Sequence, residues 1–171
     1  MTGTAHTDST LRVLLVDDDR LVRLALADIL DDDPAVTVVA QAADGAAAVE
    51  LARTQRPDVV LMDIRMPGTD GITATRRLRA LPDPPQVVVL TTFDLDQYVY
   101  DALAAGASGF LLKDTDPSEI IRAVAVAADG QAILHPAAAR RLIDRYHQDT
   151  RHATGQERAR IDRLPPGRKT F

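Results

Sequence analysis

Short apolar runs, rich in β-branched residues, alternate with helical stretches along this chain. The runs occupy residues 11–16, 36–40, 59–62, 87–90 and 110–112. They are apolar at nearly every position instead of alternating with polar residues. This pattern is typical of strands buried on both faces, as in a parallel sheet. We therefore predict five buried parallel strands.

Between the runs, apolar residues recur every three or four positions, which is the spacing of one face of an α-helix. The residues that carry this spacing are Leu21, Leu24, Ala25 and Leu30, then Ala46, Val49 and Ala52, then Ile72, Thr75 and Leu78, and finally Val99, Ala102 and Leu103. Repeated strand–helix units with right-handed crossovers predict an α/β fold, a doubly wound five-stranded parallel sheet with helices on both faces.

Start and stop signals predict two more helices. Asp116, Pro117 and Glu119 combine an N-cap, a first-turn proline and a reciprocal capping partner, so a helix should begin there and end before Gly130. Another helix should begin at Pro136, because an apolar stripe follows that proline.

The same signals divide the chain. We predict a disordered N-terminus at residues 1–10, a folded domain at 11–131, a linker helix at 132–148 that ends near Gln148, and a basic, disordered tail at 149–171.

Composition excludes several classes of protein. A chain of 171 residues with 46% hydrophobic residues can fold without disulfide or metal staples. The absence of cysteine excludes a zinc finger, an iron–sulfur site and a thiol nucleophile. No apolar run approaches the roughly 18 residues of a membrane span, and residues 1–10 do not resemble a signal peptide. We therefore expect a cytoplasmic protein without membrane contact.

Charge is unevenly distributed along the chain. Residues 1–139 contain 11 Lys and Arg against 21 Asp and Glu, whereas residues 140–171 contain 9 against 4. An acidic domain repels nucleic acid, so contact with DNA phosphates would need the basic tail or a partner.

Polar residues follow four of the predicted strands. Asp17, Asp18 and Asp19 follow the first strand, Asp63 the third, Thr91 and Thr92 the fourth, and Lys113 the fifth. Doubly wound sheets bind ligands beyond the carboxyl ends of their strands, so these side chains should meet at one edge. Clustered carboxylates repel one another unless a cation neutralises them, and Mg²⁺ prefers such oxygen ligands.

This set suits phosphoryl transfer. Asp63, which stands alone after a central strand, is the candidate nucleophile. Lys113 would balance the charge of the phosphoryl oxygens, and the Thr91 hydroxyl would bond one of them. A plainer interpretation is also open, because an Asp after a strand is often a helix cap, as we expect for Asp19, and a single Lys is usually a surface residue.

Other nucleotide and ester chemistries lack their motifs. The chain has no GxxxxGK[ST] loop, no GxGxxG after the first strand and no GxSxG elbow.

Four segments together resemble a known family. They are VLLVDD at 13–18, LMDIRMPGTDG at 61–71, VLTTFD at 89–94 and AGASGFLLKD at 105–114. In this order they resemble the receiver domain of two-component response regulators, most closely the NarL/FixJ (LuxR-type) subfamily, over roughly residues 11–131. The resemblance implies the flavodoxin-like strand order 2-1-3-4-5.

The resemblance also implies roles for individual residues. Asp63 would be the phospho-acceptor, and Mg²⁺ would be held by Asp17, Asp18, Asp63 and the backbone carbonyl of Arg65. Thr91 would be the switch hydroxyl, Phe110 the switch aromatic and Lys113 the phosphate-contacting lysine. The alternative for Phe110 is that it is an ordinary, half-buried aromatic residue of a strand. A separate hypothesis rests on position alone: Arg65 and Phe93, two residues after Asp63 and Thr91 respectively, shield the acyl phosphate from water.

Partners follow from the same resemblance. The phosphoryl donor would be a sensor histidine kinase, and the chain would catalyse only its own phosphorylation and dephosphorylation. Phosphorylation would switch a surface that binds other proteins or a second copy of this chain. Full-length relatives would use this switch to regulate transcription. DNA would be bound only through a C-terminal helix-turn-helix domain, which residues 149–171 are too few to form.

Three alternatives are weighed against this interpretation. A receiver-like binding module that acts without phosphorylation would not need the complete Asp and Lys set. A phosphohydrolase of the haloacid dehalogenase type would need an Asp where Arg65 stands. A nucleic-acid binder acting through the basic tail would bind without sequence specificity.

Overall fold

The computed structural model describes residues 10–92 and 95–162, without the side chains of residues 95–97 and 152–162. The strands are β1 (Leu11–Val16), β2 (Val36–Ala42), β3 (Val59–Met62), β4 (Gln86–Thr91), β5 (Gly109–Leu112) and β6 (Ile133–Leu134). The helices are α1 (Arg20–Asp31), α2 (Gly45–Gln55), α3 (Gly71–Arg79), α4 (Leu95–Ala104), α5 (Pro117–Ala128) and α6 (Pro136–Asp162).

The strands form one parallel sheet in the order β2-β1-β3-β4-β5-β6. This confirms the predicted doubly wound sheet and the order of its first five strands. The sixth strand was not predicted, because it has two residues and therefore no readable periodicity. Its residues pair with Gly109 and Phe110, and the His135 N–H donates to the Phe110 carbonyl over 2.9 Å.

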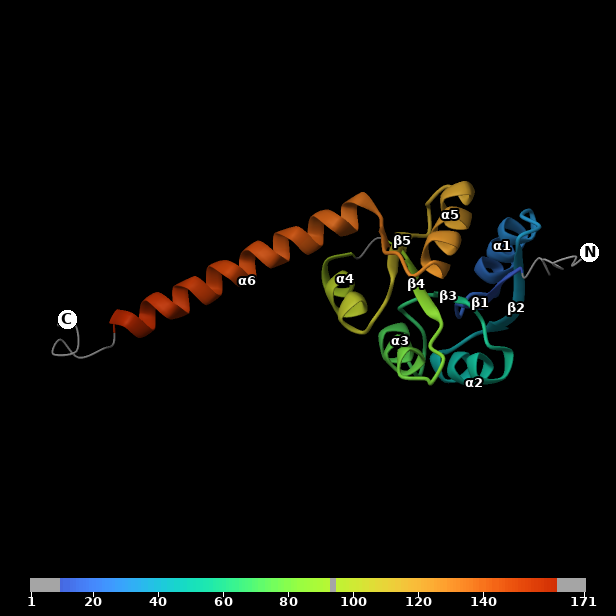
Figure 1. The fold of residues 1–171 in the computed structure, drawn as a ribbon, viewed down its shortest axis with the longest axis horizontal. Coiled ribbons are helices and arrows are strands. Elements are labelled where there is room, and N and C mark those ends of the chain that lie inside the picture. The colour runs from blue at the N-terminus through green and yellow to red at the C-terminus, as the bar shows by residue number, and fades with distance from the viewer. Residues whose placement is uncertain (1–9, 93–94, 163–171) are drawn as a thin grey trace, which may run out of the picture.

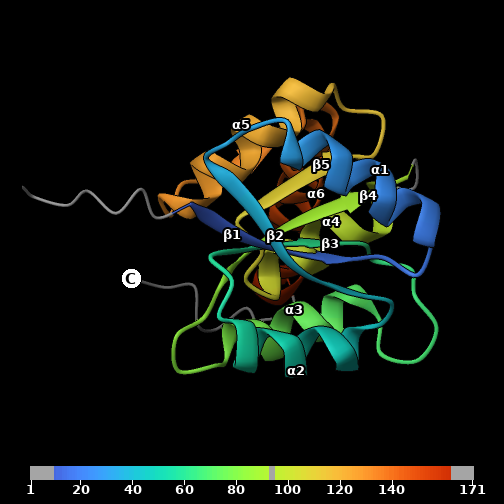
Figure 2. The ribbon, with the colours of Figure 1, turned by 90° about the vertical axis from the view of Figure 1, so that its right-hand side faces the viewer.

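Helices cover both faces of the sheet. In Figures 1 and 2, α1 and α5 lie on one face, and α2 and α3 lie on the other. Two buried clusters follow from this layering, one that joins the sheet to α1 and α5 and one that joins it to α2, α3, α4 and the start of α6. The interior strands β3 and β5 are buried at every position, as their continuous apolar sequences predict.

Aspartate side chains fix the starts of three helices. Asp19, Asp44 and Asp70 each accept a hydrogen bond from a first-turn N–H of α1, α2 and α3 respectively. The prediction for Asp19 is therefore confirmed. Asp116 precedes Pro117 at the start of α5 but makes no side-chain capping bond, contrary to the capping interpretation.

The last helix is longer than the sequence predicts. The sequence predicts an end near Gln148, whereas α6 continues to Asp162 and projects away from the sheet (Figure 1). The predicted helix end near Gln148 was therefore wrong. The physical reason is that no proline interrupts the chain until Pro165, and a single glycine, Gly155, weakens a helix without ending it.

Other predictions at the chain ends are not tested. Residues 1–9 and 163–171 lie outside the described residues, and the proposed domain boundaries stay predictions. No helix among the described residues combines the length and hydrophobicity that crossing a membrane requires.

Candidate functional site

Three carboxylates meet where β1 and β3 end. Asp17 and Asp18 follow β1, Asp63 follows β3, and one oxygen from each lies within 4.8 Å of the others. The sheet pairing continues past the strands, since the Asp17 N–H donates to the Ala42 carbonyl and the Asp63 N–H donates to the Val16 carbonyl. The sheet therefore brings together carboxylates that are 46 positions apart in the sequence.

Lys113 brings a positive charge to this cluster from the end of β5. The main-chain N–H of Lys113 donates a 2.8 Å hydrogen bond to the Thr91 carbonyl. Its Nζ lies 2.6 Å from Asp17 Oδ2 and 3.4 Å from Asp63 Oδ1. The interpretation of Lys113 as an ordinary surface lysine is thereby excluded, because its ammonium group bridges two buried carboxylates.

The electrostatics of the site raise the pKa of Asp63. Burial, followed by the charge of Asp17, raises the pKa of Asp63 from 3.8 to about 6, although Lys113 opposes this rise. For Lys113, burial lowers the pKa, but the hydrogen bond with Asp17 and the charges of both carboxylates outweigh burial and raise it. The single ammonium group does not neutralise three carboxylates, so the cluster can accept a hard cation.

The loop between β1 and α1 is tied to the cluster by Asp17. Asp17 Oδ1 accepts a 2.9 Å hydrogen bond from the Asp19 N–H, and the Asp17 carbonyl accepts a 2.6 Å bond from Arg23 Nη1. Arg23 was missed by the sequence analysis, because an arginine on a helix is usually a solvated surface residue. Its only sequence signal is its place six residues after Asp17.

Thr91 and Phe110 lie on the neighbouring strands β4 and β5. Thr91 is buried at the end of β4 and lines, with Lys113, a cavity of about 280 Å³. Phe110 is fully buried in β5, which excludes the half-buried alternative. Its ring belongs to the core on the side of α4 and α6.

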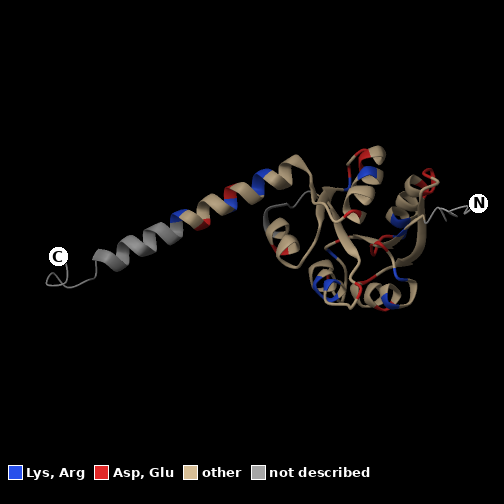
Figure 3. Ribbon diagram, in the orientation of Figure 1, with Lys and Arg blue, Asp and Glu red and all other residues tan. Residues whose placement is uncertain are grey.

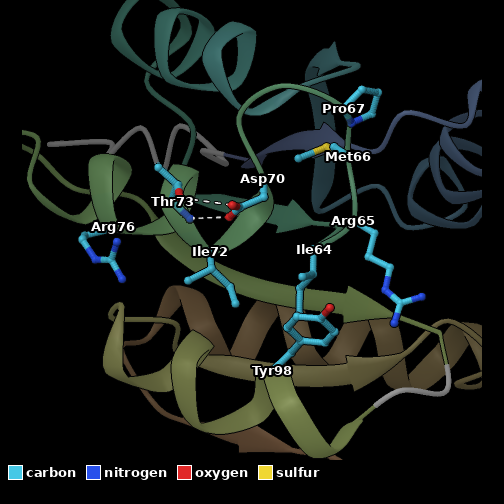
Figure 4. Close-up of a pocket in the computed structure, with 9 residues that line it drawn as sticks. All are labelled: Ile64, Arg65, Met66, Pro67, Asp70, Ile72, Thr73, Arg76 and Tyr98. Atoms are coloured by element: carbon cyan, nitrogen blue, oxygen red, sulfur yellow. Dashed lines mark hydrogen bonds between the residues drawn. The ribbon is translucent and has the colours of Figure 1, made fainter.

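Arg65 lies in the loop between β3 and α3, where its side chain is exposed. Its guanidinium carbon lies 5.5 Å from the ring centre of Tyr98 on α4. Figure 4 shows both residues at a pocket of about 600 Å³ whose lining also includes Ile64, Ile72 and Arg76. This pocket lies beside the Asp63 loop, and the acidic cluster is not part of its lining. Phe93, the second residue of the shielding hypothesis, lies outside the described residues.

The backbone after Lys113 and the charges of α6 complete the description. The Lys113–Asp114 peptide bond is trans, as are the other described peptide bonds. Basic and acidic positions alternate along the first half of α6 (Figure 3), and its described side chains beyond Leu142 are exposed.

The chain is similar to known regulatory proteins. Residues 13–125 match the family described as response regulator receiver domain. The chain is 41% identical over 133 residues to the Bacillus subtilis transcriptional regulatory protein YxjL, a match that covers 78% of this chain and 61% of the relative. It is 40% identical over 148 residues to the B. subtilis transcriptional regulatory protein LiaR, with 86% of this chain and 70% of the relative covered.

Solved structures agree with these matches. The signal receiver domain of the response regulator NarL from Mycobacterium tuberculosis is 41% identical and superposes with a TM-score of 0.69. That match covers 72% of this chain and 99% of the other. The chain spans about three fifths of the length of the first curated relatives that it matches.

Proposed function

Because this chain belongs to the response regulator receiver domain family, we propose that it is a phosphorylation switch whose acceptor is Asp63. One observation carries the proposal. The Asp63 carboxylate is buried at the sheet edge with Asp17 and Asp18 beside it and the Lys113 ammonium 3.4 Å away. A nucleophilic carboxylate, a neutralising cation and further oxygen ligands are the groups that phosphoryl transfer requires.

We propose an in-line displacement for the transfer. An Asp63 carboxylate oxygen forms a bond to phosphorus while the phosphorus–nitrogen bond of a phosphohistidine breaks. The imidazole leaves with the electron pair of that bond and takes up a proton. Lys113 binds a phosphoryl oxygen and balances its charge, and the Thr91 hydroxyl donates to another.

The cluster fits Mg²⁺ by the chemistry of its donors. We assign the ion to Asp17, Asp18, Asp63 and the backbone carbonyl of Arg65, all of which offer oxygen. When bound, the ion would supply positive charge that stabilises both the clustered carboxylates and the incoming phosphoryl oxygens. Asp18 is the exposed member of the cluster, so it can bind a cation without any change in the buried core.

The switch would start from Thr91. A phosphoryl group on Asp63 adds acceptor oxygens that draw the Thr91 hydroxyl toward it, and β4 and α4 respond. Phe110 would be the aromatic that follows. Because Phe110 is already inside the core here, phosphorylation would favour an arrangement that the unphosphorylated protein already populates.

We infer the biological setting from the family. A sensor histidine kinase would be the phosphoryl donor, the location would be cytoplasmic, and the chain would catalyse only its own phosphorylation and dephosphorylation. The output would be a protein–protein surface, including a homodimer, that regulates transcription. We assign DNA binding to a separate helix-turn-helix domain, since the described residues after β6 form only α6.

Intact-mass spectrometry tests this proposal. The protein is incubated with Mg²⁺ and acetyl phosphate, beside an Asp63→Ala variant and a sample with EDTA. We expect a gain of one phosphoryl group in the wild type and none in the two controls. No gain in folded, magnesium-binding protein would contradict the proposal and favour a receiver-like module that acts without phosphorylation.

A further inference from the structure

Arg23, in the first turn of α1, reaches back to the loop that carries Asp17 and Asp18. Its Nη1 donates a 2.6 Å hydrogen bond to the main-chain carbonyl of Asp17. Its Nε is buried and has no hydrogen-bond partner within the described part of the chain. Arg23 therefore holds the backbone of the acidic loop, although no motif in the sequence marks it.

The position of Arg23 is unfavourable for α1 itself. The first turn of α1 contains Arg20 and Arg23 and no acidic residue. Helix N-termini carry partial positive charge, so cations in the first turn are destabilising. A buried N–H without a partner adds a second cost. Residues that break a local rule in this way commonly serve a site.

The contact fixes Asp17 at a third point. Asp17 Oδ1 already accepts the Asp19 N–H, and Asp17 Oδ2 already binds Lys113. These two bonds orient the carboxylate, whereas the bond from Arg23 fixes the main chain from which the carboxylates of Asp17 and Asp18 both project. Mutual repulsion of the carboxylates would otherwise push this loop away from Asp63.

We propose that Arg23 is a positioning residue for the divalent cation site, because it keeps Asp17 and Asp18 turned toward Asp63 through the Asp17 carbonyl. This inference rests on the proposed function, which assigns the cation to these carboxylates. Arg23 acts through the loop and does not itself contact the ion.

Two substitutions separate positioning from charge. Arg23→Met keeps the apolar stem and removes every donor, and it should weaken Mg²⁺ binding about tenfold, as the loss of an outer-sphere support typically does. A purely electrostatic role predicts the opposite, because removal of a nearby positive charge would tighten cation binding. Arg23→Lys keeps the charge but replaces the planar guanidinium with a single ammonium group. The Mg²⁺ affinity of this variant should lie between those of the wild type and Arg23→Met.

The matched control is Arg20→Met. Arg20 is exposed in the same turn of the same helix, so this variant makes the same change in net charge without touching the Asp17 carbonyl. Its Mg²⁺ affinity should stay equal to or slightly tighter than that of the wild type.

Isothermal titration calorimetry of the metal-free proteins with MgCl₂ gives the affinities. A second readout is the rate of acetyl phosphate-dependent phosphorylation against Mg²⁺ concentration. For Arg23→Met we expect a higher half-saturating Mg²⁺ concentration and a rate near wild type at saturation. A third readout needs no metal, since exchange of the Asp19 amide hydrogen should be faster in Arg23→Met.

The outcomes distinguish the two claims. The role of Arg23 would be overturned if Arg23→Met bound Mg²⁺ as tightly as the wild type or more tightly. It would also be overturned if Arg20→Met lost as much Mg²⁺ affinity as Arg23→Met. Either result would leave the proposed function standing. Absence of Mg²⁺ binding by the wild type would overturn both. If Arg23→Met does not fold, the same comparison is made with Arg23→Lys, where wild-type affinity contradicts the inference.

Discussion

At the scale of single residues, Asp63 is the most strongly perturbed group of the site. Folding raises its pKa from 3.8 to about 6, so the folded protein binds this proton more tightly than the unfolded chain does. The stability that the proton contributes is fully present below pH 3.8 and is lost as the pH rises through 6. Without divalent cations, ionised Asp63 therefore costs on the order of 2 kcal/mol at pH 7.5.

Asp63→Asn removes this cost. We expect the variant to be more stable than the wild type by on the order of 2 kcal/mol at pH 7.5 and by almost nothing at pH 4. Urea denaturation in EDTA at both pH values measures the difference. A wild type that is the more stable protein at pH 7.5 would contradict the assigned pKa direction.

Lys113 is the second residue whose role can be measured directly. Lys113 lowers the pKa of Asp63, so Lys113→Met should raise that pKa above 6. Phosphorylation by acetyl phosphate should slow at least about tenfold, because the phosphoryl oxygens lose their cation. Carboxyl carbon NMR titration reads the pKa. An unchanged pKa of Asp63 in Lys113→Met would show that the ammonium does not act on it.

Sequence reasoning found these residues because each follows a predicted buried strand. Asp17, Asp63 and Lys113 could be placed at one sheet edge from topology alone. Arg23 could not, since its contribution is a contact with a backbone carbonyl and depends on how the loop folds. The full burial of Phe110 could not be predicted either, because a short apolar run does not indicate how deeply each of its side chains is buried.

At the scale of elements, α3 holds the loop that follows Asp63. Gly71 begins α3, and its N–H donates to the Ile64 carbonyl over 2.9 Å. A Cβ at Gly71 would collide with the backbone carbonyl of Asp63. The close approach of α3 to the end of β3 therefore requires glycine.

Gly71→Ala should destabilise the protein by about 3 kcal/mol, since the collision is with backbone atoms that cannot rotate away. Gly68→Ala is the control in the same loop. A Cβ there meets open space, and its φ of +78° costs only about 1 kcal/mol. Urea denaturation compares the two, and a smaller loss in Gly71→Ala than in Gly68→Ala would contradict the assigned packing.

The contact between α4 and α6 is a second feature at this scale. Ala138 of α6 is fully buried, and Arg145 lies over the ring of Tyr100 on α4 at 4.5 Å. Ala138→Glu would bury an unpaired carboxylate, so we expect α6 to leave α4 while the sheet stays folded. Hydrogen exchange should become faster at residues 98–104 and 136–148 only. Tyr146→Glu is the control, because Tyr146 is 68% exposed, and exchange equal in both variants would argue against this docking.

Periodicity predicted the helices that pack on the sheet better than those that leave it. The boundaries of α1 and α5 follow from apolar spacing and from the residues at their ends. The end of α6 cannot be predicted in this way. Beyond Leu142 the helix packs little against the rest of the fold, so its sequence has no apolar face from which its length could be predicted. Strand β6 escaped prediction because two residues define no period.

At the scale of the whole molecule, the fold gathers an acidic cluster whose mutual repulsion a bound cation would reduce. Mg²⁺ at 100 times its dissociation constant should therefore stabilise the folded protein by about 2.7 kcal/mol. Thermal denaturation with and without MgCl₂ at pH 7.5 measures this. Asp18→Ala should abolish the shift without loss of stability, since Asp18 is exposed. Equal shifts in both proteins would place the cation elsewhere.

The proposed switch depends on transfer of a phosphoryl group to Asp63. Its most direct test is to phosphorylate the protein with acetyl phosphate and Mg²⁺, reduce the acyl phosphate with borohydride and map the product by tandem mass spectrometry. Borohydride converts an aspartyl phosphate to homoserine and leaves free carboxylates unchanged. We predict homoserine at position 63 and unmodified Asp17 and Asp18. Homoserine in place of another aspartate, with Asp63 intact, would contradict the assignment of Asp63 as the phospho-acceptor.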